Sequence, residues 1–138
     1  MGASTVIHRS EIQDESSRPL LSGRWAGVID TVGGIMLDTA IRQTKHNGTV
    51  ACCGNVLGHE LHTNVYPFIL RGINLAGMDS GNCLMELRKE LWQKLASGWK
   101  PQQVDNVAKE CTLEELNTEI DIILEGKQVG RVVVNLDA

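Results

Sequence analysis

The sequence predicts an α/β fold in which a parallel sheet is flanked by helices. Short apolar runs alternate along the chain with stretches of helical periodicity, the arrangement typical of β-α-β units. The first long run, at about 26–32, is apolar at successive positions, as expected of a strand with both faces covered. Glycines follow these runs in "VGG" and "ACCG", where turns into the next element are expected.

The N-terminal third contains two predicted strands and one predicted helix. "STVIH" (4–8) is a β-branched run and predicts a strand, whereas 9–24 is rich in Ser, Pro and Gly and predicts mostly loop. The strand at about 26–32 follows. A helix comes next, because four apolar side chains fall on one helical face, and Asn47-Gly48 is its stop signal; the four are Ile35, Met36, Ala40 and Ile41.

The middle of the chain repeats the pattern of strand, loop, helix and strand. "TVACCG" (49–54) predicts a second buried strand, and "NVLGHELHT" (55–63) predicts a loop. "NVYPFILRG" (64–72) predicts a short helix with Pro67 in its first turn, where proline is tolerated. "INLAGMDS" (73–80) predicts a third strand of the same kind.

The C-terminal part predicts two helices and a last strand. A leucine stripe predicts a helix that ends near Gly98; its members are Leu84, Leu87, Leu91 and Leu95. Thr112 and Glu115 form a T-x-x-E capping box that opens a second helix, and Gly126 closes it. "RVVVNL" (131–136) predicts the final strand.

Composition narrows the class of protein and its partners. A length of 138 residues suits one domain. The net charge is −4 and Lys and Arg do not cluster, so a nucleic-acid partner is not expected. The first ten residues lack a secretory signal, and the longest apolar stretch carries Arg71 and Asn74, so no membrane span is expected. The four cysteines are therefore expected to be reduced, buried thiols in a cytoplasmic protein.

Residue patterns that would indicate a specific chemistry are weak. "GHELH" (58–62) does not have the spacing of a zinc-binding H-E-x-x-H motif, so no metal site is expected. Burial within a strand argues against Cys52 or Cys53 as a nucleophile, and no catalytic residue is assigned. No G-x-G-x-x-G occurs. Gly33-Gly34 fits either an anion site at a helix N-terminus or, as the more ordinary interpretation, a tight turn.

Five segments, in order and at the expected distances, carry a resemblance to a known family: "GASTVIHRSE", "WAGVIDTVGG", "GTVACCGN", "YPFILRGINLAGMDS" and "GRVVVNL". They resemble the C-terminal part of the quinone-oxidoreductase-like medium-chain dehydrogenases/reductases, in the branch that contains acrylyl-CoA reductases. The resemblance implies a partial Rossmann-type parallel sheet, strands three to six of the family order, with flanking helices and a C-terminal helix–strand segment. It also implies one truncated Rossmann-like domain over 1–138, in which 99–138 matches the segment that returns to the family's catalytic domain.

The resemblance further implies a cofactor, NADPH, and no metal. Arg9 matches an arginine that approaches the 2′-phosphate of NADPH, a role that suits a guanidinium. Val32 and Gly33 match the strand end that borders the ribose, and Gly54 and Asn55 match the turn near the nicotinamide half. The ordinary alternatives stay open: a solvated loop arginine for Arg9 and a simple turn for Gly54.

In the family, the glycine-rich phosphate loop and the catalytic domain precede the matched region. The resemblance therefore implies a truncated protein that is catalytically inactive alone. Two alternatives remain: an oxidoreductase subunit acting with a complementing N-terminal chain or a reassembled dimeric site, and a small-ligand binding module. The first two family strands would lie beside "GVIDTV", so their loss would open a sheet edge. A homodimer is expected through a sheet edge, Ile73 to Ser80 or Gly27 to Val32.

Overall fold

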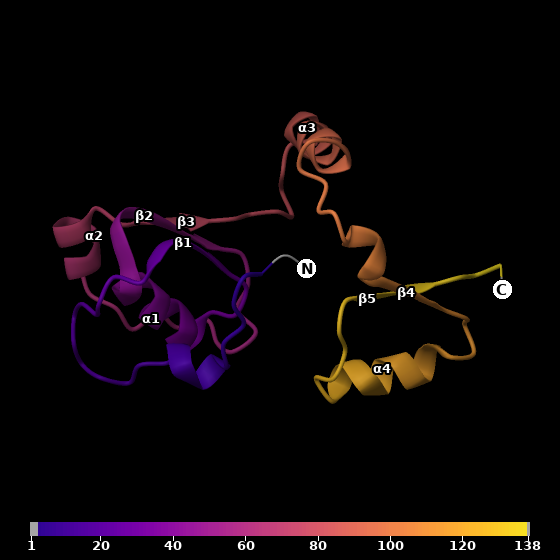
Figure 1. The fold of residues 1–138 in the computed structure, drawn as a ribbon, viewed down its shortest axis with the longest axis horizontal. Coiled ribbons are helices and arrows are strands. Elements are labelled where there is room, and N and C mark those ends of the chain that lie inside the picture. The colour runs from indigo at the N-terminus through magenta and orange to yellow at the C-terminus, as the bar shows by residue number, and fades with distance from the viewer. Residues whose placement is uncertain (1–2, 138) are drawn as a thin grey trace. The chain divides into compact units, whose positions relative to one another are not determined.

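The computed structural model describes residues 3–137, which form two compact units (Figure 1). The N-terminal unit is Thr5–Cys83, and the C-terminal unit runs from Leu84 onward together with Ala3 and Ser4. Within the described range, no helix has the length and apolar character that a membrane crossing requires. The division predicted from the sequence, one domain over 1–138 with 99–138 as a returning segment, stays a prediction.

The N-terminal unit is a three-stranded parallel sheet with two helices. Its elements in chain order are β1 (Trp25–Asp30), α1 (Gly34–Gln43), β2 (Thr44–Cys52), α2 (Tyr66–Arg71) and β3 (Asn74–Gly77). The strand order is β1-β2-β3, and both pairs are parallel. This topology confirms the predicted α/β class and the alternation of strands and helices.

The core of this unit lies between the sheet and its helices. Leu37 and Ile41, one turn apart on α1, meet Val50 of β2 and Ile73, and all four are buried. Burying each such side chain contributes about 1.5–3 kcal/mol. Partly buried side chains extend the cluster; they are Val28, Cys52, Phe68 and Leu75. Phe68 belongs to α2, so both helices pack on the same face of the sheet.

The opposite face of the sheet is open. Ile29 of β1 is 81% exposed, and it stands in register with Ala51 of β2 and, through it, Ala76 of β3. The expectation that the first strand has both faces covered is therefore wrong for this unit. The successive apolar residues of β1 make both faces of the strand suitable for burial, but α1 and α2 cover only one face of the sheet.

The predicted strand at 4–8 is also wrong. Residues 5–8 are not part of a strand, and a short 3-10 helix, η1 (Arg9–Ile12), follows them. A strand exists only when a neighbouring strand accepts its hydrogen bonds, and no described strand pairs with these residues. The β-branched side chains at 4–8 favour a strand locally, but no neighbouring strand is present to pair with them.

α1 ends earlier than its expected stop at Asn47-Gly48. The Thr44 hydroxyl donates a hydrogen bond of 2.7 Å to the Ala40 carbonyl, and the Thr44 N–H caps the Ile41 carbonyl. Thr44 then pairs with Trp25 as the first residue of β2. Asn47, at φ 60°, lies inside an irregular part of β2, where the pairing with β1 shifts register.

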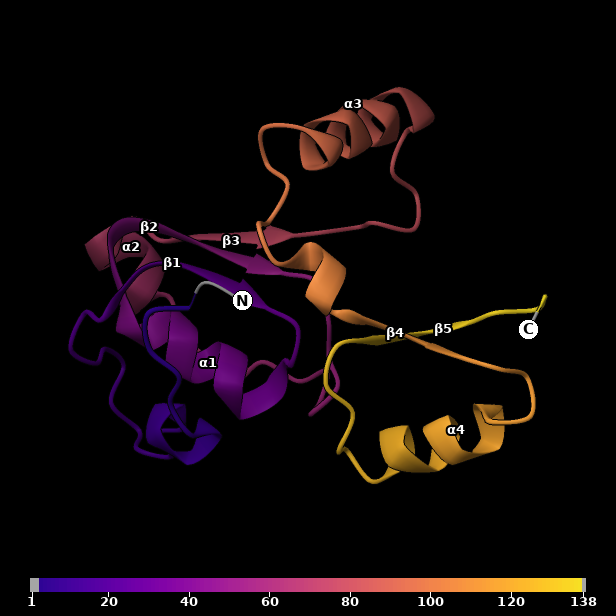
Figure 2. The same ribbon diagram turned by 45° about the vertical axis from the view of Figure 1, so that its right-hand side comes forward.

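The C-terminal unit contains a smaller β-α-β motif (Figure 2). α3 (Met85–Ala96) comes first, and β4 (Ala108–Cys111), α4 (Leu116–Leu124) and β5 (Arg131–Val134) follow, with β4 and β5 parallel. The last strand was expected and is confirmed, but β4 was missed. Its sequence, "AKEC", is mostly exposed and lacks the apolar alternation that signals a strand.

The capping box at the start of α4 is confirmed. The Thr112 N–H donates to Glu115 Oε2 at 2.9 Å, and the Glu115 N–H donates to Thr112 Oγ1 at 3.4 Å. Gly126, at φ 68°, follows the end of the helix as expected.

Thr112→Ala is expected to destabilise α4 by about 1 kcal/mol, because it removes the hydroxyl that accepts a helix N–H. Amide hydrogen exchange in α4 measures this as faster exchange. Thr112→Ser keeps the hydroxyl and should exchange like the wild type. Equal protection in the alanine and serine variants would show that the box is not stabilising.

The four cysteines are free in this structure. The expectation that they are buried holds for Cys111, which is 4% exposed, but is wrong for Cys53, which follows the end of β2 and is exposed. Burial is the largest cause that raises the pKa of Cys111, and the nearby Glu119 and Glu115 carboxylates raise it further.

Cys111 is expected to react with iodoacetamide at least roughly tenfold more slowly than Cys53, because burial limits both access and thiolate formation. Peptide mass spectrometry after timed labelling measures both rates. Raising the pH should speed labelling of Cys111, since it increases the thiolate fraction of a group whose pKa is raised. Labelling in urea is the control, and equal rates before and after unfolding would contradict the prediction.

Candidate functional site

The carboxyl ends of β1 and β2 carry the candidate site. In open α/β sheets, ligands bind at this edge. Two loops leave it, 31–33 after β1 and 53–58 after β2, and hydrogen bonds join them. The Cys53 N–H donates to the Asp30 carbonyl at 2.8 Å, and the Leu57 N–H donates to the Val32 carbonyl at 2.8 Å.

Asp30 organises the loop after β1. Asp30 is 6% exposed, and both of its carboxylate oxygens accept the Gly33 N–H, Oδ1 at 3.2 Å and Oδ2 at 3.1 Å. The Val32 N–H also donates to it, at 3.3 Å. The sequence interpretation missed this residue. An aspartate that precedes a glycine turn is a known turn signal and could have revealed it.

Gly33 and Gly54 allow the two loops to touch. Gly33 has φ 73° and ψ −163°, a backbone conformation available essentially to glycine alone. A Cβ there would lie 2.3 Å from the Gly58 carbonyl oxygen and 3.0 Å from the Asn55 Cα. A Cβ on Gly54 would lie 2.3 Å from the Thr31 carbonyl oxygen. This close approach explains why both positions are glycine.

A pocket of about 380 Å³ opens beside these loops. Its lining residues come from η1 and the residue after it, the loop after β1, α1 and the loop after β2; they are Arg9, Gln13, Thr31, Val32, Met36, Val56 and Leu57. The structure therefore brings together Arg9 and Val32, which are 23 positions apart. In the adjoining loop contact, Gly33 lies against Asn55, and Gly54 lies against Thr31. The volume falls within the usual range for small-molecule sites.

Arg9 is placed by its own short helix. The His8 N–H donates to Glu11 Oε1 at 3.0 Å, and the Ser10 N–H donates to His8 Nδ1 at 3.3 Å, which together cap η1. Arg9 is exposed on this turn and lines the pocket. The pocket thus combines one cation with two polar and four apolar side chains, and a guanidinium among them can bind an anionic group of a ligand.

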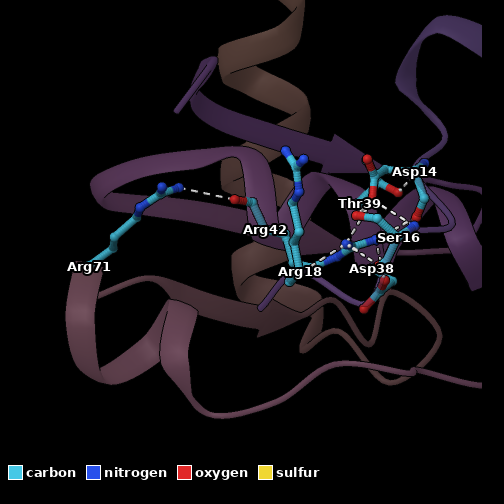
Figure 3. Close-up of polar contacts among 7 residues, drawn as sticks. All are labelled: Asp14, Ser16, Arg18, Asp38, Thr39, Arg42 and Arg71. Atoms are coloured by element: carbon cyan, nitrogen blue, oxygen red, sulfur yellow. Dashed lines mark hydrogen bonds and ion pairs between the residues drawn. The ribbon is translucent and has the colours of Figure 1, made fainter. Parts of the chain in front are cut away.

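Buried Arg42 fastens the segment that follows η1 (Figure 3). Arg42 is 3% exposed. Its guanidinium lies 2.9 Å from Asp14 Oδ1 and 2.9 Å from Asp38 Oδ2. It also donates to three main-chain carbonyls, of Asp14 (2.6 Å), Ser16 (3.0 Å) and Arg18 (3.1 Å). The long loop before β1 is thereby tied to α1, as an ordered rather than a loose connection.

Arg71 adds a second tie. Its guanidinium donates to the carbonyls of Arg42 and Thr44, both at 3.0 Å, and to that of Leu21 at 2.5 Å. Figure 3 shows it pointing from α2 toward the end of α1. Planar donors that reach several carbonyls at once are a property of arginine and not of lysine.

The two carboxylates on Arg42 differ in their electrostatics. Burial raises the pKa of Asp38, against the opposing effect of the Arg42 charge. The hydrogen bond from the Ser16 hydroxyl is the main cause that lowers the pKa of Asp14. Arg42 therefore holds one carboxylate that is costly to ionise and one that ionises readily.

Nothing in residues 3–137 fits a metal ion. In that range, no three His, Cys, Asp or Glu side chains come together closely enough to hold one. The pair formed by His62 Nε2 and Glu60 Oε2, at 3.0 Å, lies on an exposed loop.

Comparison with known proteins shows to which family this fold and sequence are similar. The family model described as zinc-binding dehydrogenase matches residues 1–97. YhfP of Bacillus subtilis (strain 168), whose name places it among the quinone oxidoreductases, is 38% identical over 137 residues. The acrylyl-CoA reductase AcuI of Ruegeria pomeroyi is 37% identical over 138 residues. The alignments cover 99% of this chain for YhfP and 100% for AcuI, but the chain spans only 42% of the length of each relative.

Solved structures of similar proteins show the same fold. The crystal structure of Bacillus subtilis yhfP with NAD bound has a TM-score of 0.90 and 38% identity, over 98% of this chain and 41% of that one. Escherichia coli K-12 YHDH with bound NADPH has a TM-score of 0.86 and 40% identity, over 96% of this chain and 41% of that one. The chain therefore belongs to the zinc-binding dehydrogenase family, in which it is a partial homologue of the quinone-oxidoreductase-like and acrylyl-CoA reductase members.

Proposed function

We propose that this chain provides part of the NADPH site of a quinone-oxidoreductase-like protein and does not catalyse hydride transfer by itself. The observation that carries the proposal is the pocket at the carboxyl end of β1, whose lining includes both Arg9 and Val32. The crystal structures of the two similar proteins contain bound nicotinamide dinucleotides, NAD in yhfP and NADPH in YHDH.

The residues present fit part of such a cofactor. The Arg9 guanidinium would hold the 2′-phosphate, and Val32 and Gly33 would border its ribose. Gly54 and Asn55 would face the nicotinamide half, whose reduced ring supplies a hydride. At Gly33 and Gly54 a side chain would collide with the main chain of the neighbouring loop, so the two glycines keep the loops together and fix the positions of Val32 and Asn55 beside them.

Two features support the lack of catalysis by the chain alone. The 138 residues contain no G-x-G-x-x-G to cradle a pyrophosphate. Each charge-assisted hydrogen bond that such a loop would donate is worth about 1.5–3 kcal/mol, so several missing bonds weaken binding by orders of magnitude. Hydride transfer also requires the nicotinamide to be held against the substrate.

The test is direct. The 138-residue chain is mixed with NADPH and either a benzoquinone or acrylyl-CoA, and NADPH absorbance is followed. We expect no oxidation above the rate without protein and no micromolar NADPH binding by fluorescence. Turnover by the chain alone would overturn the proposal. Turnover only after an N-terminal fragment of a relative is added would favour a complementing oxidoreductase subunit instead.

Arg9→Ala is expected to abolish the preference for NADPH over NADH in weak binding measured by NMR chemical-shift titration. In the wild type, we expect about tenfold tighter binding of NADPH, the effect of one charge-assisted contact to the 2′-phosphate. Arg18→Ala removes a nearby exposed arginine that does not line the pocket, so it is the matched control. An unchanged preference in Arg9→Ala would assign Arg9 to the solvated loop alone. Binding of unrelated apolar ligands in place of both dinucleotides would favour a small-ligand module.

A homodimer through a sheet edge stays part of the proposal. Among the described strands, β1 and β3 each pair on one side only. Gly27 to Val32 or Ile73 to Ser80 would provide the contact, since an unpaired strand edge can pair with another chain.

A further inference from the structure

The pocket that Arg9 lines has one wall from the segment before β1 and another from α1. Arg9 and Gln13 belong to the first wall, and Met36 belongs to the second. η1 buries none of its residues, and its capping hydrogen bonds lie within residues 8–11. The spacing between Arg9 and α1 must therefore be set by contacts that the neighbouring residues make with the helix.

Asp14 fixes this segment to α1, because three of its polar groups bond to that helix (Figure 3). Its N–H donates to the Thr39 hydroxyl at 3.0 Å. Its carbonyl accepts a hydrogen bond of 2.6 Å from Arg42, and its carboxylate lies 2.9 Å from the same guanidinium. Ile12 and Met36 also line a neighbouring cavity, but apolar packing has no direction, whereas hydrogen bonds fix an orientation.

Thr39 places this anchor one helical turn from the pocket. It is fully buried, and Met36 precedes it by three positions, so the two side chains lie on the same side of α1. Gln13, the residue before Asp14, lines the pocket together with Met36. The bond between Thr39 and Asp14 thus holds the segment that carries Arg9 at a fixed distance from α1.

We propose that Thr39 and Asp14 are positioning residues of the pocket, which set its preference for a dinucleotide with a 2′-phosphate by fixing the place of Arg9. The inference rests on the proposed function, in which the Arg9 guanidinium holds that phosphate. A charge-assisted hydrogen bond of this kind needs its heavy atoms about 2.7–2.9 Å apart, so a small displacement of η1 removes it. Contacts that NADPH and NADH share are affected equally and leave the preference unchanged.

Thr39→Val tests this role, because valine has nearly the same shape but cannot accept the Asp14 N–H. The preference for NADPH over NADH, measured by NMR chemical-shift titration, is expected to fall from about tenfold to roughly threefold or less. The Asp14 amide is expected to exchange its hydrogen at least roughly tenfold faster. Nuclear Overhauser contacts between the Met36 methyl group and Gln13 report the spacing of the two walls without any ligand, and they should weaken.

Thr44→Val is the matched control, because it removes the hydroxyl of another fully buried threonine. The Thr44 hydroxyl donates to the Ala40 carbonyl, four positions away, so this variant should keep the tenfold preference of the wild type, to within about a factor of two. Thr39→Ser retains an acceptor for the Asp14 N–H and should restore the preference, the slow exchange and the contacts. Circular dichroism verifies that each variant stays folded.

Asp14→Ala tests the other partner of the anchor. The Asp14 side chain is 30% exposed, so this variant also decides the question if Thr39→Val does not fold. Removing a negative charge from this segment would by itself favour binding of a phosphate. A lower NADPH preference in Asp14→Ala therefore has the opposite sign to the direct electrostatic effect and reports a displaced Arg9.

The outcomes separate this inference from the proposed function. The inference alone is overturned by an unchanged preference in Asp14→Ala or in folded Thr39→Val, or by equal losses in Thr39→Val and Thr44→Val. A lost preference with unchanged contacts between Met36 and Gln13 would also overturn it. A wild type that binds NADPH and NADH equally would overturn the proposed role of Arg9 itself, and this inference with it.

Discussion

Arg42→Ala is expected to lower the free energy of unfolding of the N-terminal unit by about 3–5 kcal/mol, the usual cost of removing one partner from a buried ion pair. The substitution leaves Asp38, which is 4% exposed, without its cation and leaves three main-chain carbonyls without their donor. Urea unfolding followed by tryptophan fluorescence measures the loss. Trp25 reports on this unit, because its Nε1–H donates to Gln43 at the end of α1.

Arg18→Ala is the matched control for this experiment. Arg18 belongs to the same network, but it contributes only its main-chain carbonyl, which alanine retains. Its side chain is exposed, so its removal should change the stability by less than about 0.5 kcal/mol. A similar small loss in Arg42→Ala would show that the network is dispensable.

Gly33→Ala is expected to cost at least about 1–3 kcal/mol from backbone strain alone, because φ 73° and ψ −163° are unsuited to any residue with a side chain. The clash with the Gly58 carbonyl adds to this cost, since two stretches of main chain must separate. The loop beside the pocket should shift with them. The loss is measured by urea unfolding, and the shift by amide NMR changes at residues 53–58.

Gly77→Ala is the control for the glycine substitution. A Cβ at Gly77 would meet nothing within 4 Å, and the residue lies in β3 of the same unit. Its replacement should leave stability within about 1 kcal/mol of the wild type or raise it, since alanine restricts the unfolded chain. If the two alanine variants proved equally stable, the close contact between Gly33 and Gly58 would not constrain the fold.

Elements with strong local signals were predictable from the sequence. Periodicity and capping residues located α3 and α4, and Pro67 in the first turn located α2. β4 and the residues at 4–8 failed in opposite ways. β4 pairs with β5 although its sequence lacks an apolar pattern, whereas residues 4–8 have the β-branched pattern of a strand but no strand to pair with. In both cases pairing, which depends on distant residues, decides strand formation.

The site was predictable only in part for the same reason. The resemblance selected Arg9 and Val32, and the fold places both in one pocket. Asp30 and the side chains of Met36, Val56 and Leu57 were not expected. Val56 and Leu57 join the site because a hydrogen bond holds the second loop against the first, and Met36 because α1 lies beside them; tertiary packing sets both arrangements.

The ties made by Arg42 and Arg71 also bear on the order in which the molecule assembles. Arg42 and Asp14 are 28 positions apart, and Arg71 and Leu21 are 50 apart. Contacts between such distant positions form late, because closing a long loop costs entropy before any bond rewards it. The loop that carries Arg9 takes its partners from α1 and α2, so we expect it to reach its native arrangement only with both helices in place. The pocket that Arg9 lines would then be completed at a late step of folding.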